Sequence, residues 1–145
     1  MAETKTEWIT LNVADGTSMR AYVARPLDNA AHTGLLVYQE AFGVNAHIRD
    51  VTERFAREGY IAISPELFHR TAPGFEGTYN NFEAARSHVM SLTHPNLEAD
   101  VPSGHRAWST NYLPSTSSLL ISRTHPWCRA KDVGHAQTQG RGLMF

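Results

Sequence analysis

The stretch that decides the fold is Gly34-Leu-Leu-Val-Tyr-Gln-Glu-Ala-Phe-Gly-Val-Asn45, an apolar run followed by a carboxylate, a glycine and a helix cap. Residues 35–38 have the continuous apolar character of a strand that is buried on both faces of a largely parallel sheet. Asn45 predicts the start of a helix, because its side chain can accept a hydrogen bond from a backbone N–H of the first turn. Strand, polar tip and helix in this order are typical of the ligand-binding edge of an α/β sheet.

The residues after this stretch complete a β-α-β unit. Apolar side chains recur at helical spacing in residues 48–56, and Gly59 ends the predicted helix. Residues 60–63 are again a continuous apolar run and predict the next strand. Because such a crossover is right-handed, both strands end at the same edge of the sheet. Glu40 and Glu66, which follow the two strands, are therefore expected at that edge.

The remaining elements are predicted from alternation, caps and breakers. Residues 8–13 and 19–25 alternate apolar and polar side chains around the turn dipeptide Asp15-Gly16, which predicts an opening β-hairpin. Asn81 predicts the cap of a second amphipathic helix, whose apolar face would hold Phe82, Ala85, Val89 and Leu92. Residues 96–101 predict the first turns of a third helix that Pro102 breaks. Beyond it, residues 118–122 are the stretch that could form a short strand.

Three motifs along this unit resemble the dienelactone hydrolase family of α/β-hydrolases. They are Gln39-Glu-Ala-Phe-Gly-Val-Asn45, Ile48-Arg-Asp50 and Gly59-Tyr-Ile-Ala-Ile-Ser-Pro-Glu-Leu67, and the resemblance covers roughly residues 7–101. It implies the α/β fold class, with the N-terminal half of an α/β-hydrolase-like sheet opened by a β-hairpin. It also implies a hydrolase that acts on the lactone or ester bonds of a small-molecule substrate.

Glu40 is the sharpest candidate for a functional residue. A carboxylate directly after a buried strand could act as an acid or base or hold a catalytic partner in check; the plainer interpretation is a loop carboxylate that caps the following helix. The resemblance implies that Glu40 regulates a nucleophilic cysteine, that the Ala41 N–H helps form the oxyanion hole, and that Phe42 lines the pocket. Arg70 and Arg86 are candidates for substrate binding. The aromatic residues Phe75, Tyr79 and Phe82 could line the same pocket.

The nucleophile that the family needs is not found in this sequence. It would lie on a strained turn with the pattern G-x-S-x-G or G-x-C-x-G, and no such pentapeptide occurs. The single cysteine, Cys128, has no preceding strand and no flanking glycines. Cys128, Asp132 and His135 follow the family's order of nucleophile, acid and base, but they lie too close together to reproduce a geometry built from three loops. The chain alone is therefore expected to be inactive.

The charge distribution divides the chain near Pro102. Residues 1–101 hold 8 Lys+Arg and 13 Asp+Glu, a net charge of −5, whereas residues 102–145 hold 5 and 1, a net charge of +4. We therefore expect a partial hydrolase domain over residues 1–101 and an irregular tail over residues 102–145, the product of truncation or of a frame shift. An alternative interpretation is a non-catalytic binding or interaction module built on half a hydrolase fold, whose open sheet edge a partner would complete.

Composition and spacing exclude several other functions. A net charge of −1 gives no field to gather nucleic acid or an anionic membrane, and no run of apolar residues is long enough for a membrane span or a secretory signal. The loop after residue 38 has one glycine, Gly43, and an acid, which disfavours a phosphate cradle. The eight histidines and one cysteine lack the paired spacing of a zinc site. We expect a cytoplasmic protein with no metal and no cofactor; the sequence does not indicate an oligomeric state.

Overall fold

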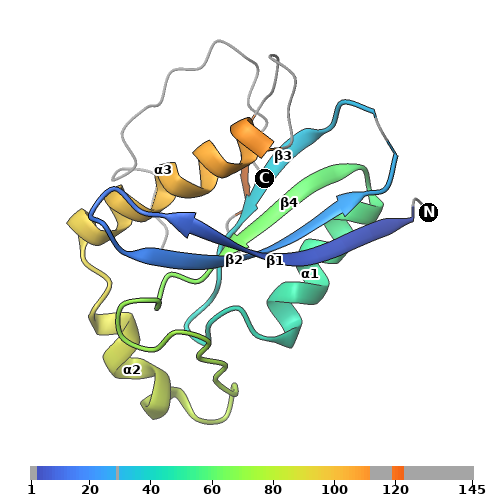
Figure 1. The fold of residues 1–145 in the computed structure, drawn as a ribbon. Helices are drawn as coiled ribbons and strands as arrows, with labels where there is room; N and C mark the ends of the chain where they lie inside the picture. Colours follow the sequence, from blue (N-terminus) through green and yellow to red (C-terminus); the bar gives the residue numbers. More distant parts are fainter. Residues whose placement is uncertain (1–2, 29, 112–118, 123–145) are drawn as a thin grey trace.

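The computed structural model describes residues 3–28, 30–111 and 119–122, and within them the strands form a mixed sheet in the order β1-β2-β4-β3-β5 (Figure 1). The hairpin strands are antiparallel to each other and β2 is antiparallel to β4, whereas β3 is parallel to both β4 and β5. The strands are β1 (Thr4–Asn12), β2 (Ser18–Pro26), β3 (Thr33–Val37), β4 (Tyr60–Pro65) and β5 (Leu119–Ser122).

The opening hairpin forms where its turn residues predict it. Gly16 has a φ of +87°, a left-handed conformation that glycine adopts without steric cost. The turn is closed by a backbone hydrogen bond of 2.9 Å from the N–H of Val13 to the carbonyl oxygen of Thr17. The side chain of Asp15 accepts further hydrogen bonds from both the N–H and the hydroxyl of Thr17. The predicted β-hairpin is therefore confirmed.

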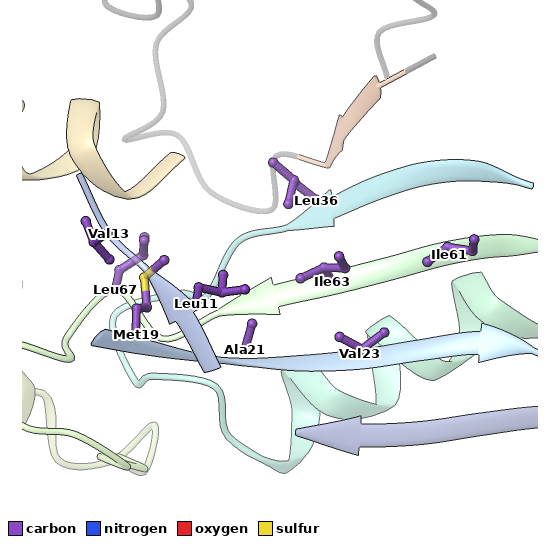
Figure 2. Packing of buried hydrophobic residues seen from close by; sticks show 9 residues of the cluster. All are labelled: Leu11, Val13, Met19, Ala21, Val23, Leu36, Ile61, Ile63 and Leu67. Atoms are coloured by element: carbon purple, nitrogen blue, oxygen red, sulfur yellow. The ribbon is translucent and has the colours of Figure 1, made fainter. Parts of the chain in front are cut away.

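One helix covers each face of the sheet (Figure 1). Helix α1 (Ala46–Arg57) buries Ile48 and Val51 in one cluster with side chains of the central strands, which are Tyr22 of β2, Leu35 and Val37 of β3 and Ala62 of β4. Helix α3 (His94–Asn111) packs on the opposite face through Leu97 and Ala99. Figure 2 shows the cluster on that face, which consists of Leu11, Val13, Met19, Ala21, Val23, Leu36, Ile61, Ile63 and Leu67. Burial of each large aliphatic side chain contributes roughly 1.5–3 kcal/mol. The clusters on the two faces therefore hold α1 and α3 against the sheet.

Helix α2 (Phe82–Met90) begins at the predicted cap, where the Asn81 side chain accepts the N–H of Ala84 at 3.3 Å. Its predicted apolar face is only partly buried. Ala85 is fully buried, but Phe82 is 51% exposed. The helix lies beyond the end of the sheet rather than over one of its faces (Figure 1), so the sheet itself does not cover the helix.

The prediction that Pro102 breaks the third helix is wrong, because α3 continues through it to Asn111. Pro102 is itself exposed, whereas the next two residues are buried. The Ser103 hydroxyl donates to the carbonyl oxygen of Ala99 at 3.1 Å, and a Cβ on Gly104 would lie 3.1 Å from Cδ2 of Leu36. Close packing of this turn on β3 offsets the helix-breaking effect of the proline.

The α/β fold class is confirmed, and the regular structure extends past the expected boundary at residue 101. The second half of α3 and the strand β5 both lie within residues 102–145, which were expected to be irregular. The short strand predicted over residues 118–122 is confirmed as β5, which pairs Leu120 with Leu35 in parallel. The other parts of the expected tail, residues 112–118 and 123–145, lie outside the described residues.

Candidate active site

The carboxyl ends of β3 and β4 lie side by side, because the two strands are parallel neighbours with Leu36 opposite Ile63. Glu40 follows β3 after a short connection, and Glu66 comes directly after β4. Both glutamates therefore lie at the same edge of the sheet, as the β-α-β order predicts. In open α/β sheets this edge is where ligands bind.

The loop between β3 and α1 is fixed at three points. The Asn45 side chain caps α1 by accepting the N–H of Ile48 at 3.1 Å. The Gln39 side-chain oxygen accepts the N–H of Leu67 at 2.9 Å, which ties the loop to the end of β4. Gly43, with a φ of +76°, forms an isolated antiparallel bridge with Glu40. The position of the Glu40 backbone is therefore set by hydrogen bonds on both sides of it.

Gly43 also makes the closest approach in this loop, and replacing it should be costly. A Cβ at this position would overlap the carbonyl oxygen of Phe75, which is backbone and cannot rotate away. We expect Gly43→Ala to lower the free energy of unfolding by about 1–3 kcal/mol for the left-handed backbone, with a further loss of similar size for the overlap. Gly74→Ala is the matched control: Gly74 has the same φ of +76° but open space around it. Equal losses in urea unfolding of the two variants would contradict this account.

The Glu40 side chain is half-buried and contacts the loop that precedes α2. Its Oε2 atom accepts a hydrogen bond of 2.9 Å from the hydroxyl of Tyr79. Burial and this contact with Glu40 raise the pKa of the Tyr79 phenol above its ordinary value, against an opposing effect of Asn45. The phenol therefore keeps its proton, and remains a hydrogen-bond donor, throughout the neutral range.

Ala41 and Phe42 follow Glu40 at the same edge, and both are half-buried. The Phe42 ring lies 4.7 Å from the Tyr79 ring, centroid to centroid, and 6.3 Å from the ring of Phe82. These aromatic side chains come from three separate segments of the chain. Phe42 thus contacts two of the aromatic residues that were expected, separately from it, to line a pocket.

Glu66 is buried, unlike Glu40. Its Oε1 atom accepts a hydrogen bond of 3.1 Å from Arg20, and the guanidinium of Arg20 stacks over the Trp8 ring at 4.2 Å from the centroid. Its backbone N–H donates to the carbonyl oxygen of Arg20 at 2.9 Å. These contacts bind the end of β4 to the hairpin, so Glu66 supports the edge on which Glu40 lies.

Arg70 is held between two carboxylates. Its Nη1 and Nη2 atoms donate to the two oxygens of Asp100 at 3.0 Å and 2.8 Å, and Nη2 and Nε donate to Asp15 at 2.6 Å and 3.0 Å. This cluster, which we call the Arg70 clamp, joins the hairpin turn, the loop after β4 and α3. Because its guanidinium is occupied, the predicted role of Arg70 in substrate binding has no support in its contacts. The other arginine of that prediction, Arg86, is exposed on α2 and pairs with Glu83 at 3.6 Å.

The Arg70 clamp makes the stability of the fold sensitive to acid through Asp15. Hydrogen bonds from Thr17 and then from Arg70 hold the pKa of Asp15 well below its usual range. A carboxyl group with a lowered pKa stabilises the folded state above its unfolded pKa. That contribution is lost as the pH falls through the pKa of the folded state. Asp15 is a surface group, so its ion pair with Arg70 is weaker than the pair of Arg70 with the buried Asp100.

The contacts among Thr17, His69 and Asp100 were not predicted from the sequence. His69 is buried, with Nε2 3.0 Å from the Thr17 hydroxyl and 3.9 Å from Asp100. Local spacing could not indicate these contacts, because Thr17 and His69 are 52 positions apart in the sequence. The candidates Cys128, Asp132 and His135 lie outside the described residues.

Within residues 3–28, 30–111 and 119–122, no three side chains of His, Cys, Asp or Glu are grouped so that they could hold a metal ion. In the same residues, no helix has the length and apolar character required to cross a bilayer.

Relatives with similar sequences carry one shared name. A protein of Azospirillum brasilense named as a carboxymethylenebutenolidase is 43% identical over 137 residues, which is 94% of this chain and 54% of the relative. A protein of the same name from Synechocystis sp. is 52% identical over 67 residues, which is 45% of this chain and 27% of the relative. The chain thus spans between about a quarter and about half of the length of these curated relatives.

Solved structures and a family model agree with these sequence matches. A crystal structure named as a dienelactone hydrolase from Klebsiella pneumoniae matches with a TM-score of 0.68 and 29% identity, over 82% of this chain and 49% of that one. An esterase from Pyrococcus furiosus, 15% identical with a TM-score of 0.54, shares the fold. The model of the dienelactone hydrolase family matches residues 19–119, more than half of the chain and the whole of the edge that carries Glu40. The chain belongs to the dienelactone hydrolase family.

Proposed function

We propose that this chain supplies the N-terminal part of a hydrolase that acts on ester or lactone bonds of small molecules. In this proposal Glu40 regulates the nucleophile, the Ala41 N–H donates to the oxyanion and Phe42 forms a wall of the pocket. Arg86 is the cation that would meet an acidic group of the substrate. The observation that supports the proposal best is the position of Glu40 and Ala41 at the shared edge of β3 and β4, inside the segment that matches the family model.

The proposed reaction follows from what this edge offers. A nucleophile attacks the carbonyl carbon, and the negative charge moves to the carbonyl oxygen. A fixed backbone N–H at that oxygen contributes roughly 2.7–4 kcal/mol to the transition state when it is one of the donors of an oxyanion hole. The tetrahedral intermediate collapses to an acyl-enzyme as the acyl C–O bond breaks, and the alkoxide takes up a proton. It leaves as the alcohol of an ester or stays attached as the hydroxyl group of an opened lactone. Water then attacks the acyl carbon, which releases the acid and restores the nucleophile. A carboxylate beside the nucleophile controls its ionisation.

The nucleophile must come from outside this sequence, which has no G-x-S-x-G or G-x-C-x-G pentapeptide. This absence suggests a direct experiment. Residues 1–119 can be joined to the part of the Azospirillum brasilense relative that follows the position equivalent to Leu119. We expect the chimera to hydrolyse p-nitrophenyl acetate with enzyme-like turnover, because the added part of the relative is expected to carry the elbow.

The control for this experiment is the same chimera with its elbow nucleophile replaced by alanine, which should be inactive. A folded chimera whose activity is no higher than that of this control would contradict the proposed function. It would favour the alternative of a non-catalytic binding module, and a search for a protein partner that completes the sheet would follow.

A further inference from the structure

Tyr79 is the side chain that contacts the Glu40 carboxylate, although the two residues are 39 positions apart in the sequence. Tyr79 lies in the loop between β4 and α2. It is 58% exposed, so its position does not follow from burial in a core. The hydroxyl donates a hydrogen bond of 2.9 Å to Oε2 of Glu40, and contacts of the loop, rather than burial of the ring, must position it.

The loop is attached to the Glu40 segment at three points. The N–H of Gly77 donates to the carbonyl oxygen of Phe42 at 2.9 Å, and the carbonyl group of Phe75 packs directly against Gly43. The Tyr79 ring lies between Phe42 at 4.7 Å and His47 at 6.2 Å, in tilted and edge-to-face arrangements that aromatic pairs prefer. Together these contacts place the hydroxyl of Tyr79 within hydrogen-bond distance of the Glu40 carboxylate.

We propose that Tyr79 is a positioning residue for Glu40, which holds one carboxylate oxygen so that the other faces the nucleophile. This inference rests on the proposed function and deepens it. A neutral phenol that donates to a carboxylate makes a charge-assisted hydrogen bond, about twice as strong as one between neutral groups. It fixes the side-chain rotamer of Glu40 without adding a second negative charge at the site. The exposure of Tyr79 allows the hydroxyl to be displaced when a substrate enters.

The surroundings of Tyr79 act on the pKa of its phenol in the direction that this arrangement requires. Burial and the contact with Glu40 both raise the pKa of the phenol. The groups that face it are Glu40 from the β3–α1 loop, the Asn45 amide, whose effect is opposite, and the His47 ring from α1. Removal of the charge on Glu40 should therefore lower the pKa of Tyr79, because the phenolate would no longer face a carboxylate.

The test measures the pKa values of the tyrosine phenols in the 145-residue chain, by following their ¹³C NMR signals as a function of pH. The variant Tyr79→Phe assigns the signal of Tyr79. Glu40→Gln is expected to lower the pKa of Tyr79 and to leave that of Tyr22 unchanged. Glu53→Gln is the matched control, because the Tyr22 hydroxyl donates to Glu53 at 2.8 Å in the same manner. This variant should lower the pKa of Tyr22 alone. Circular dichroism checks that each variant is folded.

A second measurement covers the case in which Glu40→Gln does not fold. In Tyr79→Phe, which keeps the ring contacts, the side-chain carboxyl ¹³C signal of Glu40 should move, whereas in Tyr22→Phe it should stay in place. Unchanged titration of Tyr79 in folded Glu40→Gln, or an unmoved Glu40 signal in Tyr79→Phe, would overturn the inference. Neither readout depends on turnover, so an inactive chimera with these shifts present would contradict the proposed function and not the positioning contact.

Discussion

The 145-residue chain is expected to show no triad-dependent turnover of p-nitrophenyl esters or dienelactones. In a hydrolase whose nucleophile, base and acid work as a unit, loss of the nucleophile alone lowers kcat by a factor of about 10⁶. This sequence has no elbow pentapeptide that could carry a nucleophile. The measurement is a steady-state assay with the purified chain, compared with buffer and with an equal concentration of an unrelated protein.

Cys128 provides the internal control for this prediction. It is the single cysteine of the chain, and its neighbours do not form an elbow. Cys128→Ala should therefore leave the background rate unchanged. Enzyme-like turnover that Cys128→Ala abolishes would show that residues 128–135 form a catalytic group after all, and that their short spacing was wrongly dismissed.

Loss of Asp100 should cause a much larger change in stability than loss of Asp15, the other acid of the Arg70 clamp. Its carboxylate is fully buried and accepts two hydrogen bonds from Arg70, whose side chain is 19% exposed. Breaking a buried pair by removing one partner typically costs about 3–5 kcal/mol, and Asp100→Ala should lie near the lower limit because Arg70 keeps Asp15. Urea unfolding at neutral pH measures the loss.

Asp15→Ala is the comparison, because it removes the exposed partner of the same guanidinium. The loss of unfolding free energy should be clearly smaller for Asp15→Ala, since solvent screens the ion pair between Asp15 and Arg70. Equal losses for Asp15→Ala and Asp100→Ala would contradict the view that Asp100 is the structural partner of Arg70 and that the clamp anchors α3.

Local patterns in the sequence were enough to predict the hairpin and the β-α-β unit. The turn at Asp15-Gly16 and the cap at Asn45 depend on neighbouring residues alone, and the structure forms both. The shared edge of Glu40 and Glu66 also followed from the sequence, because the handedness of the crossover leaves one arrangement. The position of the candidate site was therefore predictable before any side-chain contact was known.

The failures came where distant parts of the chain decide the outcome. Pro102 predicts a helix end by its own chemistry, but packing of Gly104 on Leu36 keeps the helix intact. The partners of Arg70 in the clamp are 55 and 30 positions away and could not be found from spacing. The contact of Tyr79 with Glu40 is equally remote in sequence, and no local periodicity could indicate it.

The central claim is that Glu40, at the shared edge of β3 and β4, controls a nucleophile supplied by the rest of a dienelactone hydrolase fold. The most direct test is the kcat/KM of the active chimera with and without Glu40→Gln, with Glu53→Gln on α1 as the control. The account predicts a loss of about 10²-fold or more for Glu40→Gln, the usual contribution of a positioned acid or base, and no loss for Glu53→Gln. A kcat/KM that Glu40→Gln leaves unchanged in the folded, active chimera would contradict the claim.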